Sequence, residues 1–205
     1  MQKTIDKKHI YGAIFYISSY DKDIEIISAA GNIQDDSQYY IASINKLFVS
    51  ALTLRQYSDS KIDINDKIAQ YLPAETIKGL HVYKEKEYSH DLTIAHLMSH
   101  TSGLPCYLMD KQADGKKVMI ELEAGIDQAW PTEKVIQVVK QMKPHFAPGT
   151  PGKAKYSDTN FQILSLVIEH IVGKPINIVL QDLFTELNMT NTYVCEDKDD
   201  KKYVP

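Results

Sequence analysis

The sequence is poor in arginine, and it has no basic run. Of the 23 basic residues among 205, only Arg55 is an arginine, so the bidentate guanidinium groups that hold phosphates are almost absent. The net charge is −4, and no basic stripe is present that would release counterions from a nucleic-acid backbone. These absences argue against a nucleotide enzyme and against nucleic acid as a partner.

Cysteine and long apolar segments are also scarce. Cys106 and Cys195 lie far apart without a C-x-x-C pattern, which fits neither a disulfide framework nor a zinc site, so both are predicted to be thiols. The longest apolar stretch, residues 47–54, is far shorter than the ~20 residues that span a bilayer, and no membrane span is predicted. The first ten residues contain no clean apolar region, so no signal peptide is predicted and the compartment stays open.

The remaining composition is that of a folded chain. With 43% apolar residues, it can bury about 70% of its unfolded surface without a metal or disulfide, as one domain or two small ones. Residues 9–18 and 23–31 are β-branched and aromatic runs joined by a short polar stretch, which predicts a β-hairpin over 9–31. In residues 43–57 the apolar side chains surround the helix axis almost completely, which predicts a helix buried in the core.

Further helices are predicted downstream, and the fold class expected is α/β (α+β). Ser157 can N-cap one of them, Gly173 stands at its C′ position, and Pro175 can open the next at N1. Two long segments, 73–91 and 101–131, exceed the usual length of loops, so they are either functional walls or contain structure that the pattern does not show. The predicted helices cover residues 66–71, 93–99, 132–142, 158–172 and 175–187.

Ser43 and Lys46 are three residues apart at the start of the first predicted helix, so their side chains share one face. A lysine in the first turn opposes the helix dipole and loses hydration, and both effects lower its pKa. Such a pair can supply a hydroxyl nucleophile, an amine base and backbone donors for an oxyanion. The alternative is that Ser43 only caps the helix while Lys46 extends into solvent.

Tyr156 lies between a Pro-Gly-rich loop and the helix predicted at 158–172, where a phenol can be aimed into a cleft; the alternative is a packing residue with a solvated hydroxyl. The G-T-P-G-K run at 149–153 does not make a phosphate loop, because its glycine spacing is short and Ala154 stands where Ser or Thr is needed. His96 and His100 have a zinc-compatible spacing but lack the H-E-x-x-H carboxylate, so no metal site is expected.

Several motifs, in order along nearly the whole chain, resemble the serine β-lactamase-related family of class C β-lactamases, DD-peptidases and small esterases. The resemblance implies a β-lactamase/transpeptidase-like fold and one domain over 1–205, with the nucleophile helix and helical region over 43–205. The motifs are Y-I-A-S-I-N-K at 40–46, K-I-D-I-N-D-K-I-A-Q-Y-L-P at 61–73, L-T-I-A-H-L-M-S-H-T-S-G-L-P at 92–105, P-G-T at 148–150, Y-S-D at 156–158 and L-N-M-T-N-T at 187–192.

The same resemblance implies roles for individual residues. Ser43 would be the acyl nucleophile, with its backbone N–H as half of an oxyanion hole. Lys46 would be its base or proton relay, and Tyr156 the second proton-transfer group. Asp158 stands where the family often has an asparagine that binds the substrate's acylamino group, and a carboxylate there accepts hydrogen bonds but cannot donate them. This departure favours peptides or esters over β-lactams.

A second departure is that no Lys-Thr-Gly or His-x-Gly segment follows Asn160, so the completing antiparallel strands are expected to be missing. The hairpin would then leave an edge open, or pair it with another chain or a C-terminal piece. The function expected is a serine hydrolase that acylates Ser43 with a D-amino-acid peptide, a β-lactam or a small ester, without a cofactor. The alternative is a non-catalytic relative that binds ligand without turnover.

Overall fold

The computed structural model describes residues 5, 10–126 and 128–195. Contacts divide the chain into two units, one of residues 1–42 and 195–205 and the other of residues 43–194. The predicted start of the hairpin at His9 lies outside the described residues. The same is true of most of the first ten residues, in which no signal peptide is predicted.

The first unit contains the predicted hairpin. Strands β1 (Gly12–Ser19) and β2 (Ile24–Gly31) pair antiparallel, with Gly12 opposite Gly31 and Ser19 opposite Ile24. Successive residues of a strand point to opposite faces, and Phe15 and Tyr16 are 50% and 55% exposed. Within the described residues β1 and β2 form a two-stranded sheet, and pairing of its edge with another chain or a C-terminal piece stays a prediction.

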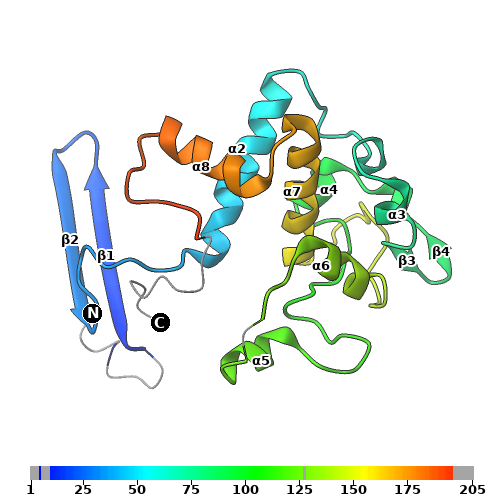
Figure 1. Ribbon diagram of the computed structural model, residues 1–205, viewed down its shortest axis with the longest axis horizontal. Helices are drawn as coiled ribbons and strands as arrows, with labels where there is room; N and C mark the ends of the chain where they lie inside the picture. Colours follow the sequence, from blue (N-terminus) through cyan, green and yellow to red (C-terminus); the bar gives the residue numbers. More distant parts are fainter. Residues whose placement is uncertain (1–4, 6–9, 127, 196–205) are drawn as a thin grey trace. The chain divides into compact units, whose positions relative to one another are not determined.

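The second unit is mainly helical and is organised around α7 (Asp158–Val172). This helix contacts α2 (Asn45–Ser58), α4 (Ile94–Met98), α6 (Thr132–Val139) and α8 (Ile176–Glu186), as can be followed in Figure 1. Most of the buried aliphatic core comes from these helices. The remaining elements of this unit are η2 (Ile68–Gln70), α3 (Ala74–Ile77), β3 (Val82–Tyr83), β4 (Lys86–Glu87), η3 (Ser89–Asp91) and α5 (Val118–Glu123), and the turn η1 (Ala42–Ile44) lies at the boundary between the two units.

Helix α2 buries one face only, so the prediction of all-round burial was wrong. Val49 and Leu52 are 3% and 2% exposed, whereas Leu47 and Leu54 on other faces are 67% and 49% exposed. The buried face packs on α7, and Phe48 meets Phe184 of α8 edge to face with ring centroids 4.9 Å apart. The apolar composition of this segment correctly predicted a helix. It wrongly predicted that the other described residues bury the helix on all sides.

The other predicted helices agree with the structure to different extents. The boundaries of α7 are confirmed, and the helix at 93–99 is confirmed as α4. The helix predicted at 66–71 is only the 3-10 turn η2, because its backbone is used elsewhere. The N–H of Ile68 donates to the Leu92 carbonyl, and the Ile94 N–H donates to the Asp66 carbonyl. Lys67 and Thr93 thus form a β-bridge instead of a helical turn.

Capping differs from the prediction in two places. Ser157 holds the N-cap position of α7 but makes no side-chain cap, because its hydroxyl donates to the Pro105 carbonyl. Gly173 ends α7 with φ of 73° as expected, whereas Pro175 is the N-cap of α8 rather than its first helical residue.

The two long segments hold short elements. Residues 73–91 contain α3, the β3–β4 hairpin and η3, and residues 101–131 contain α5. Among the described residues no single helix is long and apolar enough to cross a membrane, and one pair that passes this test jointly, α7 with α8, is bent by 79°.

Candidate active site

The segment 100–106 is fastened to the first turn of α7 by buried side chains. The Ser102 hydroxyl donates to Asn160 Oδ1 over 2.7 Å. The Pro105 carbonyl accepts hydrogen bonds from the hydroxyls of Ser157 and Thr159, at 3.0 and 2.7 Å. These contacts fix the start of α7, where two of the predicted site residues lie, against the segment that carries the His-Thr-Ser-Gly-Leu-Pro motif.

Gly103 permits the tight course of this segment. Its φ is 73°, and a Cβ there would lie 2.0 Å from the Phe146 carbonyl oxygen. The Gly103 carbonyl accepts the His145 N–H at 2.8 Å, so the two backbones run in direct contact. Only glycine fits a left-handed conformation with so close an approach, which accounts for the glycine in the motif.

Ser43 lies in the turn η1, directly before α2, and its side chain is exposed. The preceding Ala42 has φ of 45°, a left-handed conformation that is costly for a residue with a Cβ and often marks functional sites. Lys46 Nζ donates to Ser43 Oγ over 3.1 Å. The spacing of three residues thus brings the hydroxyl and the amine together as the sequence predicted.

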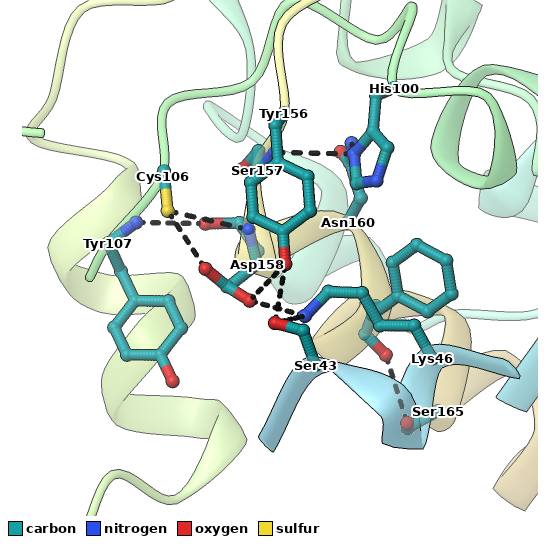
Figure 2. A network of polar contacts seen from close by, with 12 residues as sticks. Ser43, Lys46, His100, Cys106, Tyr107, Tyr156, Ser157, Asp158, Asn160 and Ser165 are labelled. Carbon is teal, nitrogen blue, oxygen red and sulfur yellow. Dashed lines mark hydrogen bonds and ion pairs between the residues drawn. The ribbon is translucent and has the colours of Figure 1, made fainter. Parts of the chain in front are cut away.

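Tyr156 completes the cluster from the other side, as Figure 2 shows. Its hydroxyl lies 2.7 Å from Ser43 Oγ, and either group can be the donor. The ring packs on His100 with centroids 4.6 Å apart, and Lys46 Nζ lies 5.1 Å from the ring centroid. Tyr156 is 45% exposed, so its ring packs on His100 on one side while the residue stays partly open to solvent.

Asp158, at the start of α7, is surrounded by donors of the protein itself. Oδ1 accepts Lys46 Nζ at 2.5 Å and the Tyr156 hydroxyl at 3.2 Å. Oδ2 accepts the thiol of Cys106 at 3.3 Å, and the Asp158 N–H points back to that sulfur. The expectation of a substrate contact here stays a prediction, while the structure gives both carboxylate oxygens internal partners.

The expected depression of the pKa of Lys46 was wrong. Burial does favour the neutral amine, but the hydrogen bond to Asp158 and the interactions with Tyr156 together outweigh it and raise the pKa of Lys46 above that of an ordinary lysine. The amine and carboxylate are 18% and 14% exposed, so the ion pair is shielded from solvent. Lys46 is therefore an ammonium at neutral pH, and it donates to Ser43 rather than accepting from it.

His100 is held as the neutral tautomer protonated on Nε2. Its Nδ1 accepts the Ser157 N–H at 3.2 Å and lies 3.0 Å from Asn160 Nδ2. Burial and the nearby Lys46 charge lower the pKa of His100, which keeps Nδ1 free to accept. In the described part of the chain, no cluster of His, Cys, Asp and Glu can hold a metal ion.

The sequence that brings an exposed serine, an ammonium and a phenol together also matches a known protein family. The family model described as Beta-lactamase matches residues 3–204. The chain belongs to the beta-lactamase family. The resemblance seen in the motifs is thereby confirmed, and so is the α/β class with a partial fold of the β-lactamase and penicillin-binding-protein type.

Relatives of this beta-lactamase-family chain are about one-quarter identical to it over the matched residues. It is 26% identical over 162 residues to a putative D-alanyl-D-alanine carboxypeptidase of Escherichia coli, covering 75% of this chain and 33% of the relative. It is 25% identical over 192 residues to an N-acetylmuramyl-L-alanine amidase of Bacillus subtilis, covering 92% and 39%. The chain therefore spans little more than a third of these relatives.

A solved relative supports the fold of this family member. The D-stereospecific amidohydrolase of a Streptomyces species superposes with a TM-score of 0.71 at 24% identity. The match covers 87% of this chain and 50% of the Streptomyces protein. At this identity the likeness shows the fold.

Sequence reasoning brought together Ser43, Lys46 and Tyr156, and the structure places them within hydrogen-bonding distance. It did not foresee that Cys106 contacts Asp158, nor that His100 supports Tyr156. Both residues belong to or follow the His-Thr-Ser-Gly-Leu-Pro run, which was the available signal. That run marks a segment close to the site, but it does not say which side chains turn toward α7.

Proposed function

We propose that the protein is a serine hydrolase in which Ser43 forms the acyl-enzyme. The observation that carries this proposal is the exposed Ser43 hydroxyl, 2.7 Å from Tyr156 Oη and 3.1 Å from Lys46 Nζ. A nucleophile needs a neighbouring group that takes its proton and charge that stabilises the product of attack. Tyr156 is positioned for the first task and the Lys46 ammonium for the second.

The reaction would follow the usual two steps of acyl transfer. Ser43 Oγ bonds to the substrate carbonyl carbon as its proton passes to Tyr156 Oη, and Tyr156 releases its own proton to its hydrogen-bond acceptor. The carbonyl electron pair becomes an oxyanion that the Ser43 N–H would hold. Collapse breaks the scissile bond, the leaving group takes a proton from Tyr156, and Tyr156 takes its proton back from the acceptor. Water then releases the acyl group in the same way, and Ser43 is regenerated.

The substrate class proposed is an amide or ester of a D-amino-acid peptide. The curated relatives are named as a putative carboxypeptidase and an amidase, and both names describe cleavage of an amide bond. A carboxylate can only accept hydrogen bonds, and both oxygens of Asp158 already accept bonds from the protein. This side chain therefore gives no donor to an acylamino group of the substrate. D-amino-acid peptides and small p-nitrophenyl esters should therefore be better substrates than cephalosporins.

Intact mass spectrometry tests the proposal. The 205-residue chain is incubated with a fluorescent penicillin or a fluorophosphonate, beside the variants Ser43→Ala and Ser58→Ala, of which the latter removes another exposed serine near the far end of α2. One adduct on the parent and on Ser58→Ala, but none on Ser43→Ala, supports Ser43 as nucleophile. A Ser43 adduct without any hydrolysis of a small p-nitrophenyl ester would favour the non-catalytic alternative, and equal labelling of all three proteins would reject Ser43.

A further inference from the structure

The hydrogen bonds around Ser43 have a direction, which follows from counting protons. Lys46 is an ammonium and can only donate, so Ser43 Oγ accepts its N–H. The single proton of the Ser43 hydroxyl then points to its other contact among the described residues, Tyr156 Oη, at 2.7 Å. Tyr156 accepts that proton, and its own proton is left for Asp158 Oδ1, at 3.2 Å.

Asp158 is the end of this chain of donors, because its carboxylate can only accept. Oδ1 takes the bonds of Lys46 and Tyr156, and Oδ2 takes the thiol of Cys106. Cys106 is 1% exposed, and burial raises the pKa of its thiol, so the sulfur keeps its proton and can donate it. The carboxyl group is thereby held with Oδ1 toward the site (Figure 2).

We propose that Asp158 is the final acceptor of the Ser43 proton, which reaches it through Tyr156, and that Lys46 remains an ammonium throughout acylation. This inference rests on the proposed function and names the proton path within it. As Ser43 Oγ bonds to the carbonyl carbon, its O–H bond breaks and a new O–H bond forms on Tyr156. In the same step the original Tyr156 proton moves to Asp158 Oδ1, and the negative charge passes to the substrate oxygen.

The return path balances the first. When the tetrahedral intermediate collapses, Tyr156 gives its proton to the leaving nitrogen or oxygen, and Asp158 gives its proton back to Tyr156. The Lys46 ammonium lies beside Ser43 and Asp158 in both steps, so it offsets the charge of the Asp158 carboxylate before attack and that of the nearby substrate oxyanion after it. Asp158 acts through Tyr156 and is a positioning residue that also stores the proton.

The two candidate bases predict different pH dependences of acylation. If Lys46 were the base, only its neutral amine would react, which is below about one molecule in a thousand at pH 7, and the rate would rise about tenfold per pH unit. With Asp158 as acceptor, the rate should change less than about threefold between pH 7 and 9.5. The titratable groups that face Asp158 are Lys46, His100, Cys106, Tyr107 and Tyr156.

The experiment measures the rate of Ser43 acylation by a fluorescent penicillin across this range for the parent and Asp158→Asn. The variant keeps an acceptor oxygen but cannot store a proton, so acylation at pH 7 should fall at least about 100-fold. The remaining rate should rise steeply with pH, because Lys46 has lost its counter-ion. Asp110→Asn is the matched control, since Asp110 also contacts Cys106 but lies outside the proton path; its rate and profile should equal the parent's.

A second variant pair tests the part played by Cys106 in holding the carboxylate. Cys106→Ser keeps a donor to Oδ2 and should keep the parent's rate and flat profile, whereas Cys106→Ala removes the donor and should lower the acylation rate at pH 7. A parent rate that climbs tenfold per pH unit, or an Asp158→Asn variant with the parent's rate and profile, would overturn the proton path alone. A parent whose Ser43 is labelled by neither the penicillin nor a fluorophosphonate would overturn the proposed function and the path together.

Discussion

Replacing Gly103 with alanine should destabilise the protein much more than the same replacement at Gly152. Both glycines have a left-handed φ, 73° and 71°, but a Cβ at Gly152 meets nothing within 4 Å, whereas at Gly103 it would lie 2.0 Å from the Phe146 oxygen. The left-handed conformation alone costs an alanine roughly 1–2 kcal/mol. Gly152→Ala therefore measures this cost without a clash.

At Gly103 the backbone must also separate from residue 146. The movement would strain two hydrogen bonds, from the His145 N–H to the Gly103 carbonyl at 2.8 Å and between His81 Nε2 and the Phe146 carbonyl at 3.0 Å. Losing bonds at buried groups costs about 1–3 kcal/mol, which gives a total of roughly 2–5 kcal/mol for Gly103→Ala. Urea unfolding followed by circular dichroism measures both variants, and equal losses would refute the close contact at Gly103.

Three further predictions concern the same unit. Because the pKa of His100 lies below its ordinary value, the stability that this residue contributes is complete above about pH 6.5 and is lost as the pH falls through the folded-state pKa; His100→Asn should flatten the dependence of Tm between pH 7 and 5, and an unchanged slope would contradict it. Ser102→Ala leaves Asn160 Oδ1 without its donor and should cost about 1–3 kcal/mol in urea unfolding, so a loss within error would count against this bond. Arg55→Ala breaks an exposed bidentate pair with Glu186 and should cost less than about 1 kcal/mol; a larger loss would show that this pair is more than a surface contact.

Local sequence patterns predicted what depends on neighbours in the chain. The boundaries of α7 follow from Ser157 and Gly173 at its two ends, and the approach of Ser43 to Lys46 follows from a spacing of three residues. The pKa of Lys46 could not be predicted in this way, because Asp158, which reverses its direction, lies 112 residues away in sequence. The helix predicted at 66–71 failed for the same reason: its backbone pairs with residues 92–94, and no window around it contains them.

The two cysteines differ in burial, so their rates of reaction with a thiol reagent can report local opening of the site. Cys195 is exposed, while Cys106 is buried at the end of the segment 100–106, which meets α7. A thiol reagent should modify Cys195 at once and Cys106 only when that segment lifts from the helix, since a reagent must wait for local opening to reach a buried group. The rate of the slow phase of modification therefore measures how often the segment 100–106 separates from α7 while the rest of the chain stays folded.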